Sequence, residues 1–175
     1  MATQTVKEKS QAFAKYGTSM VVGITGKAGV IPTRNLQTGH FPEYEKIGGD
    51  SLVNNYKTKD SACARCPLHC GNVTKAEKDY KVETEGPEYE TLAMFGANLG
   101  NSNLESIIMA NNLCNEYGMD TISCADTIAC AYELFENGII TEKDTDGLKL
   151  VWGDHRAMIR LVEMTGKREG FGRLI

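Results

Sequence analysis

The stretch SNLESIIMANNLCNEYGMDTIS, residues 102–123, contains the clearest secondary-structure signal in the chain. Ser102 followed by Glu105 has the pattern of a capping box, in which two side chains bond the free N–H groups at a helix start. Behind it, apolar and small residues recur at helical spacing. These residues are Ile107, Ala110, Cys114 and Tyr117. Gly118 fits a helix C-terminus, so the stretch predicts a helix that ends in a tight turn.

Two further helices are predicted beyond this turn. The first runs from about Ile122 to Glu136 and ends at Asn137-Gly138, and its small residues allow a neighbouring helix to approach closely. Thr141–Asp144 has the pattern of another capped turn. Asp154 is placed to cap a last helix. One side of that helix carries Met158, Leu161, Val162 and Thr165.

The first half of the chain shows less periodicity. From about Thr3 to Tyr16 one helical face is apolar or small, and Gly17 fits the end of that helix. Residues 17–60 are rich in Gly, Pro, Asn and Thr, which predicts turns and irregular chain. The polar piece NVTKAEKDYKVETEG, residues 72–86, is typical of a short exposed hairpin. We therefore expect a single domain over residues 1–175 with an all-α fold, a multihelical domain with an irregular glycine-rich leading segment and a cysteine loop.

Length and composition exclude several classes of protein. A chain of 175 residues can bury one core, and its hydrophobic content of 41% argues against intrinsic disorder. The net charge of −4 is spread without a block of like charges, so neither nucleic acid nor a membrane surface is an expected partner. The apolar runs are shorter than a membrane span, and the first residues lack the pattern of a secretory signal. A cytoplasmic protein is expected.

The segment VVGITGKAGV, residues 21–30, contains the spacing G-x-T-G-x-x-G of a dinucleotide-binding turn. Such a turn needs a strand before it and a helix after it. Only three apolar residues precede the motif, and Pro32 falls where the helix would be in its first turns. The lysine is not a Walker lysine either, because Ala28 stands where a hydroxyl should follow. We reject a nucleotide site and expect a flexible or tightly turned loop.

The segment CARCPLHC, residues 63–70, places three cysteines in a C-x2-C-x3-C loop. In a chain of this size without a secretory signal, clustered cysteines indicate metal or redox chemistry rather than disulfides. Zinc could use Cys63, Cys66, His69 and Cys70, although four ligands within eight residues make a cramped tetrahedron. An iron–sulfur cluster spreads its irons, so that closely spaced thiolates bind different irons and a fourth ligand comes from elsewhere. The spacing favours the cluster over zinc, and the polar neighbours disfavour three metal-free core thiols.

Three other cysteines are candidates within the chain for a fourth ligand. They are Cys114, Cys124 and Cys130. Cys114 and Cys130 are predicted to lie on apolar helix faces, and Cys124 near a helix start. For each of them a small core residue is the stronger interpretation.

Six segments together resemble the tungsten-containing aldehyde ferredoxin oxidoreductase family. They are GVIPTRNLQTGHF, CARCPLHCGNVTK, EGPEYETLAMFGANLG, NNLCNEYGMDTIS, LFENGIIT and WGDHRAMIRLVEMTGKREGFGRLI, and they follow the family's order over nearly the whole chain. The resemblance implies a longer protein in which an amino-terminal pterin domain precedes this first helical domain and a last helical domain follows it. The abrupt end REGFGRLI fits the same expectation of a truncated chain.

The resemblance assigns cofactor ligands by motif match. It implies that Cys63, Cys66 and Cys70 bind a [4Fe–4S] cluster whose fourth cysteine lies beyond Ile175. It also implies that NEYGMD, residues 115–120, contacts a tungsten (or molybdenum) bis-pterin. The contacting residues would be Asn115, Met119 and Asp120. Asn115 and Met119 replace the family's aspartate and leucine, so a charge is lost at the first position while hydrogen bonding is kept. As structure, the segment is expected to form a helix C-cap and a turn.

A family carboxylate near the metal falls within EGPEYET, residues 85–91. The resemblance implies Glu90 as the catalytic group and Glu88 as the second choice, whereas the residues alone favour a solvated turn. His155 lies outside the family's histidine motif and is expected to face solvent near a helix start. Residues 109–112 contain no pair of Glu and His, so the metal that bridges subunits in some members is not expected.

The implied activity is oxidation of a small aldehyde to a carboxylic acid, with electrons passing through the cluster to ferredoxin. Without the main pterin cradle, the 175 residues alone are expected to be inactive. Other reductions carried out on this scaffold, including aromatic ring reduction, are compatible with the residues, and so is a homo-oligomer. The alternative function is a free-standing iron–sulfur or zinc-binding module without catalysis.

Overall fold

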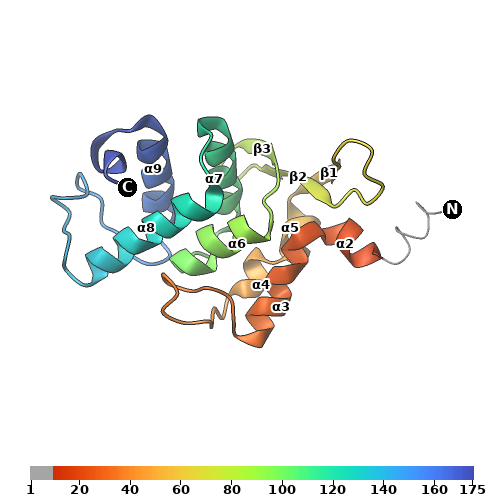
Figure 1. Cartoon of the computed structure of the whole chain (residues 1–175), viewed down its shortest axis with the longest axis horizontal. Coiled ribbons are helices and arrows are strands. Elements are labelled where there is room, and N and C mark those ends of the chain that lie inside the picture. Colours follow the sequence, from red (N-terminus) through yellow and green to blue (C-terminus); the bar gives the residue numbers. More distant parts are fainter. Residues whose placement is uncertain (1–9) are drawn as a thin grey trace.

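The computed structural model describes residues 10–175, and Figure 1 shows how their helices and strands are arranged. Helix α2 (Gln11–Tyr16) lies at one end of an elongated molecule, and α9 (His155–Lys167) lies near the other, with the 3-10 turn η3 (Gly170–Arg173) after it. The helical part between them contains α6 (Tyr89–Phe95), the 3-10 turn η2 (Ala97–Leu99), α7 (Leu104–Tyr117) and α8 (Thr121–Glu136). Of the helix predicted from Thr3, Gln11–Tyr16 is confirmed, and residues 3–9 lie outside the described residues.

A three-stranded antiparallel sheet makes the fold mixed, so the all-α prediction is wrong. Its strands, in the order β1-β2-β3, are β1 (Lys57–Ser61), β2 (Gly71–Ala76) and β3 (Val82–Glu85). The hairpin predicted for residues 72–86 is confirmed, since β2 pairs with β3 from Val73↔Glu85 to Ala76↔Val82. The sequence KTKDS of β1 lacks the β-branched and aromatic pattern of a strand. Its pairing with β2 across the cysteine loop holds it extended.

The leading segment is helical over residues 17–28 and 44–55, which corrects the prediction of irregular chain there, whereas residues 29–43 form turns and irregular chain as predicted. It contains the 3-10 turn η1 (Gly17–Ser19), α3 (Met20–Ala28), α4 (Tyr44–Ile47) and α5 (Gly49–Asn55). A Cβ on Gly26 would lie 2.3 Å from the Tyr44 ring, so glycine lets α3 and α4 pack closely. This packing outweighs the low helix propensity of glycine. The loop expected at the G-x-T-G-x-x-G motif is therefore also wrong, and the helix there is not the strand–turn–helix that a dinucleotide requires.

The helices predicted in the second half of the chain are confirmed. Gly118 ends α7 with a left-handed φ of 67°, Asn137-Gly138 follows α8, and Asp154 precedes α9. Helix α7 packs on α9, and α6 packs on α8. Their fully buried side chains form the core: Leu92, Phe95, Ile107, Ile108, Ile128, Tyr132, Met158 and Leu161. Among residues 10–175, no helix is long and apolar enough to cross a membrane.

The capping box predicted from Ser102 and Glu105 is wrong. Asn103 caps α7 instead, because its Oδ1 accepts the backbone N–H of Ser106 at 2.9 Å. Glu105 is buried and accepts backbone N–H groups of residues 78–80, in the turn between β2 and β3. The turn at Thr141–Asp144 is confirmed, since Asp144 Oδ2 accepts the N–H of Thr141 at 2.8 Å.

Asp154→Ala is expected to lower the free energy of unfolding by about 1 kcal/mol. Asp154 Oδ1 accepts the N–H groups of Arg156 at 2.9 Å and of Ala157 at 3.2 Å, and alanine would leave both donors to water. Urea unfolding followed by circular dichroism measures the loss. Asp154→Asn keeps an acceptor oxygen and is the control with a smaller expected loss. Equal losses in the two variants would contradict the capping role.

Candidate metal centre and cofactor surface

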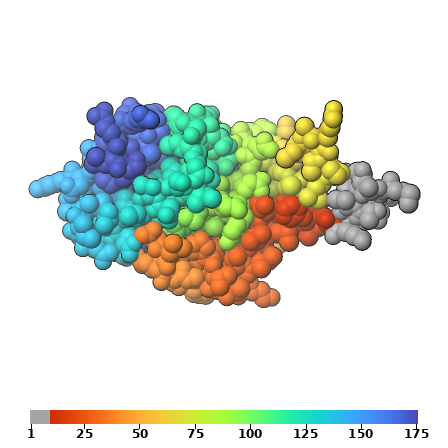
Figure 2. All heavy atoms as spheres, viewed as in Figure 1, coloured from red at the N-terminus to blue at the C-terminus, as the bar shows by residue number. Residues whose placement is uncertain are grey.

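The cysteine loop lies between β1 and β2, and Figure 2 shows this part of the chain projecting at one end of the molecule. The N–H of Cys66 donates to the carbonyl of Cys63 at 3.0 Å and closes a turn between the first two thiols. All three thiols are free; Cys63 is exposed, and Cys66 and Cys70 are half-buried. In the part of the chain that the structure describes, no three Cys, His, Asp or Glu side chains converge on a site for a single metal ion. The predicted ligands therefore share one loop without forming a one-ion site.

The loop is anchored to the rest of the domain at Cys70. The backbone of Gly17 lies against the Cys70 carbonyl, where a Cβ on residue 17 would come within 2.2 Å of the oxygen. Asn72 Nδ2 donates to the carbonyl of Tyr16 at 3.2 Å. Burial raises the pKa of the Cys70 thiol, and the negative charge of Glu88 raises it further. Turn η1 therefore lies against the backbone of Cys70, and the charge of Glu88 at the start of α6 acts on the Cys70 thiol.

Asn72 leaves an unpaired acceptor beside this anchor. The residue is 3% exposed, and among the described residues its Oδ1 has no hydrogen-bond donor. A buried amide oxygen left in this way costs about 1–3 kcal/mol. Thiols are the soft donors that iron–sulfur clusters use. The three thiols of one loop are the kind of donors that such a cluster uses, so the loop fits three ligands of a cluster.

The other three cysteines have different surroundings. Cys114 and Cys124 are buried, as predicted for small core residues, whereas Cys130 is exposed on α8 and its predicted core position is wrong. A hydrogen bond with the Cys124 thiol, together with burial, raises the pKa of Cys114. Cys130 faces solvent because the buried face of α8 is made by its neighbours Ala129 and Ala131.

The two predicted carboxylates, Glu88 and Glu90, stand exposed at the start of α6. Glu88 Oε2 accepts the hydroxyl of Thr18, and Thr18 Oγ1 accepts the N–H of Tyr89 at 2.8 Å. Glu90 lies in the first turn of the helix. Thr18 of η1 therefore holds the Glu88 side chain, and η1 is also the turn whose Gly17 contacts the cysteine loop.

The segment predicted to contact a pterin forms the turn between α7 and α8. Asp120 caps α8, and its Oδ2 accepts the N–H and the hydroxyl of Ser123, both at 2.7 Å. These two bonds lower the pKa of the Asp120 carboxyl. Met119 and Asp120 line a shallow groove of about 190 Å³, whereas Asn115 is exposed on the last turn of α7. The predicted C-cap and turn are confirmed, and the pterin contact stays a prediction.

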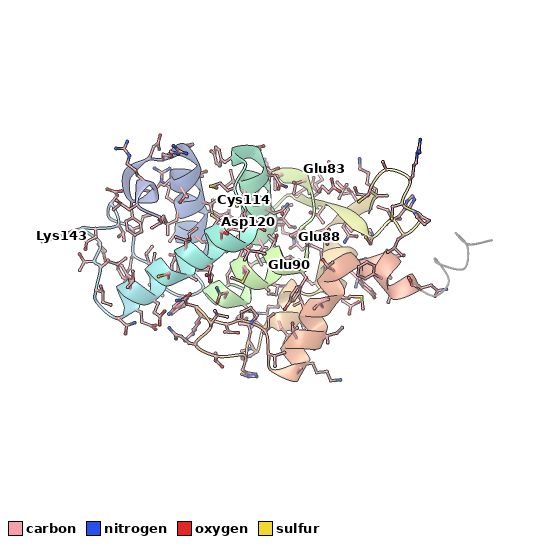
Figure 3. All side chains as sticks on the ribbon, in the orientation of Figure 1. Glu83, Glu88, Glu90, Cys114, Asp120 and Lys143 are labelled. Carbon is pink, nitrogen blue, oxygen red and sulfur yellow. The ribbon has the colours of Figure 1, made fainter. Side chains whose placement is uncertain are left out.

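Short contacts connect these groups from one segment of the chain to the next. Gly17 touches the Cys70 carbonyl, Thr18 bonds Glu88, and the Thr91 hydroxyl donates to Thr121 Oγ1 at 2.9 Å beside Asp120. In Figure 3, Glu88, Glu90 and Asp120 lie in the middle of the molecule, well away from Lys143. The connecting residues are small and lie 30 to 71 positions from their partners, so no spacing in the sequence reveals them.

His155 does not face solvent as predicted. The residue is half-buried, its Nδ1 lies 2.8 Å from the Tyr80 hydroxyl, and its Nε2 lies 3.4 Å from Asn103 Nδ2. The Asn103 oxygen already accepts from Ser106, so its nitrogen donates to Nε2 and the ring proton lies on Nδ1. His155 therefore joins the starts of α7 and α9 and lies apart from the cysteine loop.

Comparison with known proteins identifies the family of this chain. The sequence profile described as "Aldehyde ferredoxin oxidoreductase, domains 2 & 3" matches residues 1–175. The chain belongs to the aldehyde ferredoxin oxidoreductase family, as the resemblance of its six segments indicates.

Three relatives show how much of the family's length is present. The tungsten-containing aldehyde ferredoxin oxidoreductase of Pyrococcus furiosus is 41% identical over 159 residues, which is 90% of this chain and 26% of that protein. The enzyme of the same name from Thermococcus kodakarensis is 40% identical over 159 residues, which is again 90% of this chain and 26% of that protein. The aliphatic sulfonate oxidoreductase WOR-like subunit of Pyrococcus furiosus is 33% identical over 82% of this chain and 23% of its own length. The chain spans about a quarter of these relatives.

A solved structure shares the fold. The active site complex BamBC of benzoyl coenzyme A reductase, in complex with 1,5-dienoyl-CoA, superimposes with a TM-score of 0.67 at 19% identity. The match covers 92% of this chain and 24% of that one. The mixed architecture of helices and a small sheet is therefore not peculiar to this chain.

Proposed function

We propose that the chain forms the cluster-binding part of a tungsten-pterin oxidoreductase that oxidises an aldehyde to a carboxylic acid and passes electrons to ferredoxin. In such an enzyme it would be the middle, first helical domain. The observation that carries the proposal is the cysteine loop, which Gly17 and Thr18 connect to Glu88 at the start of α6. Helix α6 in turn contacts the residue after Asp120 through the Thr91–Thr121 hydrogen bond. The relatives' names support tungsten, the aldehyde and ferredoxin.

The thiols and the turn after α7 would hold the cofactors. Cys63, Cys66 and Cys70 would each bind one iron of a [4Fe–4S] cluster, which supplies one-electron transfer when bound. The Asp120 carboxylate would accept N–H groups of a pterin, with Met119 on the same groove and Asn115 on the last turn of α7. A tungsten or molybdenum bis-pterin supplies the two-electron chemistry at the aldehyde carbon when bound, while the protein supplies position and charge.

The exposed carboxylates would move protons. Oxidation of an aldehyde consumes one water and releases two electrons and two protons, so a carboxylate near the reacting carbon can act as a proton acceptor. Glu90 is the favoured group, since it stands in the first turn of α6 next to the Thr91–Thr121 contact. Glu88 is the second candidate, because its Oε2 is already engaged by Thr18.

Anaerobic reconstitution of the chain tests the cluster assignment. With ferrous iron, sulfide and a small thiol as the exogenous fourth ligand, we expect about four irons and four sulfides per chain. Cys63→Ser, Cys66→Ser and Cys70→Ser are each expected to lose most of the bound iron, as measured by metal analysis and electron paramagnetic resonance. Cys130→Ser removes an exposed thiol outside the loop and is expected to leave the iron content unchanged.

Two outcomes would contradict parts of the proposal. One zinc per chain without iron or sulfide would replace the cluster with a zinc site and favour the non-catalytic module. Stoichiometric tungsten in the purified 175-residue chain would contradict its assignment as a middle domain, because the main pterin cradle would then have to lie within it.

A further inference from the structure

Turn η1 touches the cysteine loop with its first residue. Gly17 has φ 61° and ψ −151°, a conformation that is essentially restricted to glycine. Its backbone approaches the Cys70 carbonyl so closely that a Cβ would lie 2.2 Å from the oxygen. This contact ties the backbone of Cys70, which carries the third thiol, to the turn.

The second residue of the same turn touches Glu88. The hydroxyl of Thr18 donates to Glu88 Oε2, and its oxygen accepts the N–H of Tyr89 at 2.8 Å. Donor and acceptor are both used, so the hydroxyl holds the carboxylate and the start of α6 together. Glu88 is otherwise exposed, and without this bond its side chain could turn into solvent.

The third residue fixes the turn to the body of the domain. Ser19 is 1% exposed, and its hydroxyl donates to the carbonyl of Tyr16 at 2.5 Å. The backbone of Gly49 in α5 packs against it, where a Cβ would lie 3.0 Å from Ser19 Oγ. Ser19 therefore fixes the turn in the interior. The two preceding residues make the outward contacts, Gly17 with Cys70 and Thr18 with Glu88.

We propose that η1 is a spacer that sets the position of the Glu88 carboxylate relative to the cluster at Cys70, with Thr18 as the positioning residue for Glu88. The inference rests on the proposed function, since it requires a cluster on the cysteine loop. A fixed negative charge near a cluster disfavours its reduced, more negative state and lowers its reduction potential. The Thr18 hydroxyl thus acts on the potential only through Glu88.

The midpoint potential of the reconstituted cluster tests this inference. Glu88→Gln removes the charge, and we expect an upward shift of the potential. Thr18→Val removes the hydroxyl at nearly constant shape and is expected to shift the potential in the same direction by a smaller amount. Thr18→Ser keeps the hydroxyl and is expected to restore the parent value. In the double variant Thr18→Val/Glu88→Gln, the shift is expected to equal that of Glu88→Gln alone.

Hydrogen exchange of the Tyr89 amide tests the geometry without any cofactor. Its protection is expected to fall in Thr18→Val and to return in Thr18→Ser, because the hydroxyl oxygen is its acceptor. An unchanged potential in Thr18→Val, or additive shifts in the double variant, would overturn the inference while leaving the cluster assignment intact. Failure of the parent chain to form any cluster would instead overturn the proposed function, and the inference with it.

Discussion

Gly17→Ala is expected to lower the free energy of unfolding by about 3 kcal/mol or more and to abolish iron binding at the cysteine loop. The backbone conformation at residue 17, φ 61° and ψ −151°, is strained for alanine by itself. The new Cβ would also lie 2.2 Å from the Cys70 carbonyl oxygen, which is a backbone atom and cannot rotate away. The loop would have to shift, and the thiols would shift with it.

The control for this prediction is Gly29→Ala. Gly29 also has a positive φ, 70°, but nothing lies within 4 Å of the Cβ position, so only the backbone strain of about 1–2 kcal/mol is expected. Iron binding should be unchanged in this variant. Urea unfolding and metal analysis of both variants separate strain from collision. Equal stability losses and equal iron contents would show that the contact with Cys70 does not support the loop.

Glu105→Ala is expected to lower the free energy of unfolding by about 3 kcal/mol. Glu105 is 4% exposed, and its Oε2 accepts the backbone N–H groups of Lys78 at 3.2 Å, Asp79 at 2.7 Å and Tyr80 at 3.3 Å. Hydrogen bonds to a charged acceptor are among the stronger ones in proteins. Alanine would leave three donors without a protein partner and release the turn between β2 and β3 from α7.

Two measurements make the Glu105 prediction specific. Glu116→Ala changes an exposed glutamate of the same helix and is expected to alter stability by less than about 0.5 kcal/mol. Burial raises the pKa of the Tyr56 phenol, and the charge of Glu105 raises it further, so that pKa should fall in Glu105→Ala. A stable variant with an unchanged Tyr56 pKa would show that the carboxylate does not hold the turn.

The helices could be predicted where the signal lies within a few turns of the chain. The apolar spacing of Ile107, Ala110 and Cys114 and the stop at Gly118 correctly describe α7. The β2–β3 hairpin could be predicted as well, but strand β1 and the helices of the leading segment could not. Strand β1 is polar and depends on its partner β2, and α3 contains a glycine that only the Tyr44 ring explains. In both cases tertiary contacts outweigh local propensity.

Sequence alone was sufficient for the family and for the turn at Asp120, because the family's segments and the turn each consist of residues that are neighbours in the chain. The metal-binding role of the three thiols in the cysteine loop stays a prediction. Tertiary structure decided what joins them. The Gly17–Cys70, Thr18–Glu88 and Thr91–Thr121 contacts link distant segments through small side chains or bare backbone. It also showed that the buried Glu105 side chain bonds the turn between β2 and β3 instead of the start of its own helix. A short polar residue looks the same in sequence whether it faces water or a distant partner, so only the packed chain shows which groups are in contact.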